Sequence, residues 1–331
     1  MNIVVCIKQV PEADEVKIDR TTGTLIREGV PCAINPPDLN ALEEALRIRE
    51  RFKPGEMGPM GSMPMVNVVS MGPPQVEAAL RDALALGADR AVLLCDRAFA
   101  GADTLATSYT LAAAIRKLWV GDGVGSGSGF GDAVGAGIRG GEAGDKGSML
   151  IICGNRSADG DTGHVGPQLA EKLGIPYITS VRRLEPLNVD STATATVTAA
   201  AAADVADTAD MAGSAGSKGW GGRVRAERLV DDGYEVVEAP LPLLVTVVKG
   251  MNSPRLPSLK GMMRAKKAAI TVWGASDLDV DAGRVGLSGS ATQVVRVFEP
   301  ERPRGRGELI TGAPGEQARK LLSRLREARM L

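Results

Sequence analysis

Residues 149–173 read Met-Leu-Ile-Ile-Cys-Gly-Asn-Arg-Ser-Ala-Asp-Gly-Asp-Thr-Gly-His-Val-Gly-Pro-Gln-Leu-Ala-Glu-Lys-Leu. The apolar run Met149–Cys153 predicts a buried strand, and the polar, glycine-containing stretch Gly154–Gly166 predicts a loop. A helix is expected over Gln168–Leu173, and Tyr177–Val181 begins another strand. A strand, a loop, a helix and a strand in succession form the repeating unit of an α/β fold.

The same alternation continues toward the N-terminus. Its strands are continuously apolar, which is typical of a parallel sheet covered by helices on both faces. The expected strands are Asn2–Lys8, Met65–Met71 and Ala91–Cys95. The expected helices are Leu39–Arg51, Gln75–Leu86 and a third that carries Leu105, Tyr109, Leu111, Ala112 and Ile115 on one side. The stretch Asn35–Asp38 contains two prolines and interrupts the regular structure. Asp38 is expected as the N-cap of the helix that follows. The fold class predicted is a doubly wound, mostly parallel, Rossmann-like α/β sheet.

Several stretches lie outside this alternation. Lys17–Arg27 suggests a hairpin, Arg223–Val248 is rich in strand patterns, and Glu316–Arg329 predicts a C-terminal helix. Segments near 55–63, 121–146 and 191–222 are dominated by small and polar residues and are expected to be flexible insertions. We therefore predict an α/β domain over 1–273 and a C-terminal arm over 274–331 that contacts a partner subunit.

Composition excludes several classes of function. A net charge of −1 gives no bulk attraction to nucleic acid or to an anionic membrane. No run reaches the roughly 20 apolar residues of a membrane helix, and the apolar start is too short for a signal peptide, so we expect a cytoplasmic protein without membrane insertion. The four cysteines form no CxxC pair and the single histidine is His164, so no metal site is expected.

The stretch Gly154–Pro167 is the first candidate site. Its small residues would let the backbone approach a phosphate, and the following helix would supply N–H groups. An ordinary turn with Asp159 and Asp161 as caps is an open alternative, and a Mg²⁺ site on these two carboxylates ranks below both. Arg156 has the charge to neutralise a phosphate.

The second candidate site is the stretch Gly250–Lys267. It combines a proline-containing loop with four apolar residues beside five basic ones, which indicates a docking surface. In the alternative, the apolar side chains face the core, an interpretation that suits Met262 and Met263. The C-terminal helix carries an apolar stripe that would pack on its own domain or on a partner subunit; the stripe is Ala318, Leu321, Leu322 and Leu325.

Several motifs together resemble the electron-transfer flavoprotein beta subunit family. They are the opening Val-Cys-Ile-Lys-Gln-Val-Pro, Ala33-Ile-Asn-Pro, Ser70-Met-Gly-Pro, Ala85-Leu-Gly-Ala-Asp-Arg, Asp159-Gly-Asp-Thr with Val-Gly-Pro, and Ser253-Pro-Arg-Leu-Pro-Ser-Leu with Arg-Ala-Lys-Lys. The resemblance covers nearly the whole chain except the three insertions. The Asp159 motif and the Ser253 motif together are specific, whereas either alone is moderately so.

The resemblance implies two sets of functional residues. An adenine-nucleotide pocket would be formed by Cys6, Asn35, Pro36, Pro37, Asp38, Met71, Gly154, Asn155, Arg156, Ser157, Ala158, Asp159, Gly160, Asp161, Thr162, Gly163, His164, Val165, Gly166 and Pro167. A loop that recognises dehydrogenases, anchored by Leu259, would be formed by Arg255, Leu256, Pro257, Ser258, Leu259, Lys260, Gly261, Met262, Met263 and Arg264. The resemblance also implies a heterodimer with an alpha subunit that carries the electron-transferring FAD.

The family divides by the nucleotide in this pocket, and the Asp159 motif is similar to the FAD-binding, electron-bifurcating branch. In that branch NADH would deliver hydride to this FAD. One electron would pass to ferredoxin or flavodoxin, and the other through the alpha-subunit FAD to an acyl-CoA-type or other dehydrogenase or a quinone-linked oxidoreductase. The alternatives are an AMP-binding beta subunit with a structural and docking role, and a stand-alone adenine-nucleotide sensor. An ATP-using enzyme of this fold would need a phosphate-handling signature, and no Gly-x-x-x-x-Gly-Lys-[Ser/Thr] loop is present.

Overall fold

The computed structural model describes residues 2–11, 31–52, 64–120, 149–188, 220–295 and 307–330. All but the last of these ranges belong to one compact unit, and residues 307–330 belong to a second. The strands are β1 (Asn2–Cys6), β2 (Gln9–Pro11), β3 (Cys32–Ile34), β4 (Met65–Met71), β5 (Arg90–Leu94), β6 (Met149–Gly154), β7 (Tyr177–Asn188), β8 (Trp220–Val230), β9 (Gly233–Pro240), β10 (Leu243–Val247) and β11 (Thr271–Trp273). The α-helices are α1 (Pro36–Arg51), α2 (Glu77–Leu86), α3 (Thr104–Val120), α4 (Val165–Leu173), α5 (Leu259–Lys267), α6 (Ala275–Leu278) and α7 (Pro314–Glu327).

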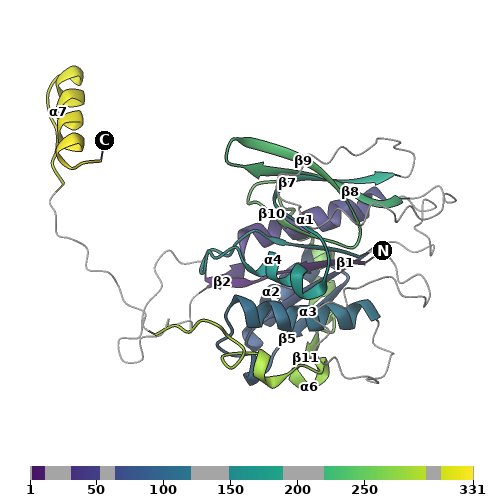
Figure 1. Ribbon diagram of the computed structural model, residues 1–331. Helices are drawn as coiled ribbons and strands as arrows, with labels where there is room; N and C mark the ends of the chain where they lie inside the picture. The colour runs from purple at the N-terminus through teal and green to yellow at the C-terminus, as the bar shows by residue number, and fades with distance from the viewer. Residues whose placement is uncertain are drawn as a thin grey trace. The chain divides into compact units, whose positions relative to one another are not determined.

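In the described part of the first unit, nine strands form one sheet in the order β11-β5-β4-β1-β6-β10-β7-β8-β9 (Figure 1). The pairs from β11 to β7 are parallel, and β7, β8 and β9 continue the sheet as an antiparallel extension. The chain runs outward from β1 to β4 and β5, and then returns to place β6 on the other side of β1. This reversal of direction puts the switch in strand order between β1 and β6, as in doubly wound folds.

Helices cover both faces of the parallel part, as the apolar strand sequences predict. Alternate residues of β1 serve opposite cores: Ile3 and Val5 pack with α1 and α2, whereas Val4 and Cys6 pack with α3 and α4. The predicted α/β fold class is therefore confirmed. Within the part of the chain that the structure describes, no helix combines the length and the apolar character needed to cross a membrane.

Helix α1 begins earlier than the sequence predicted. Asn35 holds the N-cap position, and Pro36 and Pro37 occupy the first turn. Proline suits this position because the first N–H groups of a helix have no intrahelical partner. The expectation that Asp38 is the N-cap is therefore wrong: Asp38 lies inside the helix and is buried. This shift of about one turn changes what the Asp38 carboxylate can contact.

Other boundaries also differ from the sequence-based expectation. Strand β10 comes from the stretch Arg223–Val248, which the sequence placed outside the alternation, but it lies between β6 and β7 in the parallel part of the sheet. Trp220, at the end of a predicted insertion, begins strand β8. Residues 275–295 belong to the first unit, and Leu278 and Val285 enter its core. The predicted hairpin and the remainder of the three insertions lie almost wholly outside the described residues.

Candidate functional site

The stretch Gly154–Pro167, called here the glycine loop, starts at the carboxyl end of β6. Lys8 follows β1, which lies beside β6 in the sheet. The glycine loop and Lys8 therefore flank the switch in strand order. Ligands of open α/β sheets bind in the crevice beyond the carboxyl ends of the strands at this point. The sequence placed Lys8 at the end of the first strand and did not include it among the site residues, whereas β1 ends at Cys6 and leaves Lys8 beyond the strand.

Asp38 joins the two sides of this switch point. One carboxylate oxygen accepts a hydrogen bond from the backbone N–H of Lys8 at 2.8 Å, and the other accepts one from Gly154 N–H at 2.9 Å. Burial raises the pKa of Asp38 to about 7, although the hydrogen bonds oppose this shift. Both oxygens are engaged within the chain, so Asp38 positions the loops around the crevice.

Asn35 supports the next part of the glycine loop. Its side-chain oxygen accepts a hydrogen bond from Ala158 N–H, and its amide nitrogen donates to the Arg156 carbonyl, both at 3.0 Å. Asn35 itself is buried. The first turn of α1 therefore holds the glycine loop at three backbone positions, and this explains why Asn35 and Asp38 come together with the glycine loop as the sequence predicted.

The two carboxylates of the loop face cations. Lys8 Nζ lies 2.7 Å from an oxygen of Asp159, and Arg156 lies 3.3 Å from Asp161, with both members of the second pair exposed. Burial raises the pKa of Asp159, but the hydrogen bond and charge of Lys8 outweigh this effect and hold it below its ordinary value. His164 occupies the N-cap position of α4, so neither aspartate caps this helix.

The local backbone fits a phosphate-bearing ligand. A Cβ on Gly154 would lie 2.3 Å from Asp38 Oδ1, whereas one on Gly160 would meet only Ser157 Oγ, at 3.4 Å. Gly163 has a φ of 68°, in the left-handed region that favours glycine. Helix α4 then starts without a side-chain cap, which leaves N–H groups of its first turn for an anion.

Cys6 and Cys153 lie side by side in register at the ends of β1 and β6. Both are free and buried, and burial raises the pKa of Cys6 to about 12. They behave as small apolar residues under the crevice. Met71, at the end of β4, is half-buried on the opposite side of β1 from the glycine loop. Pro36 and Pro37 belong to the first turn of α1.

The second candidate site, Gly250–Lys267, is called here the docking segment. Four of its apolar side chains are exposed: Leu256 by 89%, Leu259 by 71%, Met262 by 42% and Met263 by 56%. The alternative that Met262 and Met263 face the core is therefore wrong. The buried residue of α5 is Ala265.

Helix α5 is held against α2 at short range. Ser258 caps α5 by accepting a hydrogen bond from Gly261 N–H at 3.0 Å. A Cβ on Gly261 would lie 2.3 Å from the carbonyl oxygen of Ala85, so only glycine allows this approach. Arg264 donates to the carbonyl of Leu84 at 3.0 Å. The exposed apolar residues are thus presented from a fixed support.

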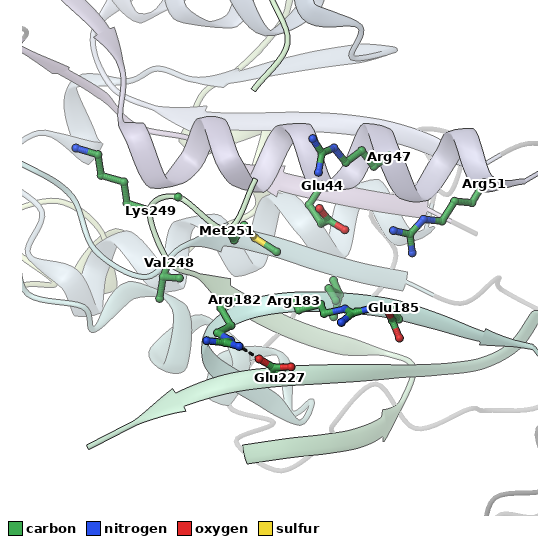
Figure 2. A pocket seen from close by; sticks show the side chains of 12 residues that line it. Glu44, Arg47, Arg51, Arg182, Arg183, Glu185, Glu227, Val248, Lys249 and Met251 are labelled. Atoms are coloured by element: carbon green, nitrogen blue, oxygen red, sulfur yellow. Dashed lines mark hydrogen bonds and ion pairs between the residues drawn. The ribbon is translucent and has the colours of Figure 1, made fainter. Parts of the chain in front are cut away.

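A separate polar cleft lies between the C-terminal half of α1 and strands β7 and β8 (Figure 2). It has a volume of roughly 560 Å³, and none of the predicted site residues lines it. Several of its cations are already paired: Arg182 with Glu227, Arg183 with Glu185, and Arg47 with Glu43 of α1. The cleft is therefore distinct from the glycine loop, and it touches the docking segment at Gly250 and Met251.

Comparison with known proteins agrees with this geometry. The chain is 41% identical to an electron transfer flavoprotein subunit beta of Thermoanaerobacterium thermosaccharolyticum, over 98% of each protein. The chain belongs to the electron transfer flavoprotein beta subunit family. The family described as "Electron transfer flavoprotein domain" also matches residues 22–124.

Two further relatives of this electron transfer flavoprotein beta subunit carry other names. The caffeyl-CoA reductase–Etf complex subunit CarD of Acetobacterium woodii is 39% identical over 100% of both proteins. The protein FixA of Bradyrhizobium diazoefficiens is 38% identical over 95% of this chain and 87% of the relative. The family therefore assigns the chain a role in electron transfer.

Proposed function

We propose that this protein is the beta subunit of a heterodimeric electron transfer flavoprotein, and that its glycine loop binds FAD. The observation that carries the proposal is the convergence of Lys8, Asn35, Asp38 and the glycine loop at the switch point between β1 and β6. The relatives named beta subunits support a partnership with an alpha subunit, and the CarD relative supports assembly into a larger complex.

The residues at the switch point would divide the work of holding the nucleotide. The N–H groups at the start of α4 would bind phosphate oxygens, while Asp38 and Asn35 keep the loop in place. FAD would supply the electron chemistry, accepting two electrons and passing them on singly. The exposed guanidinium of Arg156 would place a positive charge near the ring system and stabilise negative charge that develops there on reduction.

The donors and acceptors follow from the resemblance to the FAD-binding branch. A flavin held at the glycine loop would supply the means of taking electrons from NADH. The proposed acceptors are ferredoxin or flavodoxin and, through the alpha-subunit FAD, a dehydrogenase or a quinone-linked oxidoreductase. The docking segment would receive an acyl-CoA-type dehydrogenase, with Leu259 as the anchor. The exposure of Leu256 and Leu259 beside Lys260 supports this role.

The nucleotide content of the heterodimer tests the proposal. The chain is co-purified with its alpha subunit, the complex is denatured, and the released nucleotides are measured by absorbance and by mass. We expect two FAD per heterodimer. One FAD with one AMP would overturn the FAD assignment and the electron relay through this subunit, and would favour an AMP-binding subunit with structural and docking roles.

A further inference from the structure

Arg255 lies in the docking segment, yet its guanidinium is bound within its own chain. Nε donates to Glu43 at 2.8 Å, and the two terminal nitrogens donate to Glu43 at 3.2 Å and to Glu50 at 2.5 and 3.1 Å. The backbone N–H of Arg255 also donates to Glu43, at 3.1 Å. A planar guanidinium held by two carboxylates has few donors left for another protein.

The carboxylates are committed to this contact. The Glu43 side chain is only 6% exposed and also accepts a hydrogen bond from Arg47. Burial raises the pKa of Glu43, but the bonds from Arg255 and Arg47 outweigh it and keep the pKa below its ordinary value. The bond from Arg255 likewise lowers the pKa of Glu50. Glu43 and Glu50 lie on α1, two turns apart, so they fix both the position and the direction of the guanidinium.

A second contact holds the start of the docking segment to the same helix. The amide of Asn40 accepts from Gly250 N–H at 3.0 Å and donates to the Asn252 carbonyl at 2.8 Å. Asn252 donates back to the Asn40 carbonyl at 3.0 Å and to Glu44 at 3.1 Å. Asn40 and Glu44 are both buried. The chain from Gly250 to Arg255 is thus bound to α1 at both ends, immediately before Leu256.

We propose that Arg255 is a positioning residue and not a contact with the partner: through Glu43 and Glu50 it fixes the loop that presents Leu256 and Leu259. The inference rests on the proposed docking role of the segment. It assigns the partner contact to the exposed apolar residues and to Lys260, which is exposed and has no ion-pair partner among the described residues. Glu43 and Glu50 become part of the docking machinery although neither lies in the segment.

Removing the Glu43 charge distinguishes the two alternative roles of Arg255, direct contact with the partner and positioning of the loop. If Arg255 contacted the partner, Glu43→Gln would release its guanidinium and leave docking unchanged or stronger. If Arg255 positions the loop, Glu43→Gln and Arg255→Gln weaken docking alike. Four variants of the heterodimer are compared with wild type: Glu43→Gln, Arg255→Gln, Lys260→Gln and Leu259→Ala. Each is assayed with an acyl-CoA dehydrogenase as electron donor, and the assay gives kcat and KM for the heterodimer.

We expect Arg255→Gln and Glu43→Gln each to raise KM by about tenfold with kcat and nucleotide content unchanged, because each loses hydrogen bonds between charged groups. Hydrogen exchange of the amides over 250–258 should accelerate in both variants and not in Lys260→Gln. A raised KM in Arg255→Gln with an unchanged or lowered KM in Glu43→Gln would overturn the proposal.

The hydrogen-exchange measurement distinguishes failure of the docking role proposed for the segment from failure of the positioning role proposed for Arg255. If Leu259→Ala leaves KM unchanged, the docking role proposed for the segment fails. The positioning role is then decided by exchange alone: equal rates over 250–258 in wild type, Arg255→Gln and Glu43→Gln would overturn it, and faster exchange in both variants would support it.

Discussion

The glycine loop and the docking segment both depend on α1, but they are held by different forces. The first turn of α1 holds the glycine loop through part-buried hydrogen bonds that the backbone N–H groups of Gly154 and Ala158 donate to Asp38 and Asn35. The later turns hold the docking segment mainly through ionic contacts of Glu43 and Glu50 with Arg255. One helix thus supports the glycine loop through hydrogen bonds to its backbone and, further along, the docking segment through charged side chains.

This difference determines what each region tolerates. Where the glycine loop touches α1, at Gly154, close contact leaves no room for an added methyl group. The docking segment leaves large side chains in solvent, so truncating them costs little stability and would affect association alone. Substitutions can therefore break one region while the other stays intact.

The largest effect is expected at Gly154. Gly154→Ala places a methyl group 2.3 Å from Asp38 Oδ1 and 2.7 Å from Pro37 Cβ, so the loop or α1 must shift. We expect a destabilisation of about 1–3 kcal/mol and loss of the bound nucleotide, measured by denaturant unfolding and by nucleotide release. The matched control is Gly160→Ala, whose methyl group meets only Ser157 Oγ at 3.4 Å. Equal behaviour of the two variants would contradict the close fit.

The next effect concerns pH and Asp38. Its pKa of about 7 in the folded protein lies above the ordinary value of 3.8, so the folded state binds this proton more tightly than the unfolded state. The contribution of this bound proton to the free energy of unfolding is fully present below pH 3.8 and is lost as pH rises through about 7. Asp38→Asn should lower Tm at every pH but flatten its decline between about pH 4 and about pH 7. Parallel Tm curves for variant and wild type would show that Asp38 does not titrate in this way.

A smaller, purely associative effect is expected at Leu259. Its side chain is 71% exposed, so Leu259→Ala should leave Tm within about a degree of wild type. We expect KM for the heterodimer to rise by about tenfold with an acyl-CoA dehydrogenase as donor. The control is Val272→Ala, another exposed apolar residue, on strand β11. A similar rise in the control would remove the special role of the docking segment.

The smallest structural effect is expected at Arg156. Its ion pair with Asp161 is exposed on both sides, so Arg156→Ala should change the stability by less than about 0.5 kcal/mol. If its charge stabilises reduced flavin, the potential of the beta-subunit flavin becomes more negative in this variant. Potentiometric titration of the heterodimer checks this, and an unchanged potential and semiquinone yield would refute the role.

Much of the fold was predictable because local patterns carry it. The apolar runs of β1, β4 and β6 and the polar loops after them identify a doubly wound sheet, and the glycine loop was found from residues adjacent in sequence. The position of β10 was not predictable in this way. Its place between β6 and β7 depends on long-range pairing that no local pattern encodes.

The candidate sites show the same limit. The sequence marks Arg255 as a basic residue beside exposed apolar ones, but not that Glu43 and Glu50, more than 200 residues earlier, bind it. Asp38 was expected as a cap because its type suits a cap, whereas the two preceding prolines already begin the helix. Exposure of Met262 and Met263 depends on how α5 packs against α2, which helical periodicity alone does not decide.

The most direct test of the account is hydrogen exchange of the wild-type heterodimer before and after the nucleotides are removed. The account predicts that amides over Asn155–Val165 lose protection on removal, while those over 250–258 keep it because Arg255 and Asn40 hold them independently. Unchanged protection of Asn155–Val165, with the loss appearing elsewhere in this chain, would contradict the assignment of the nucleotide to the glycine loop.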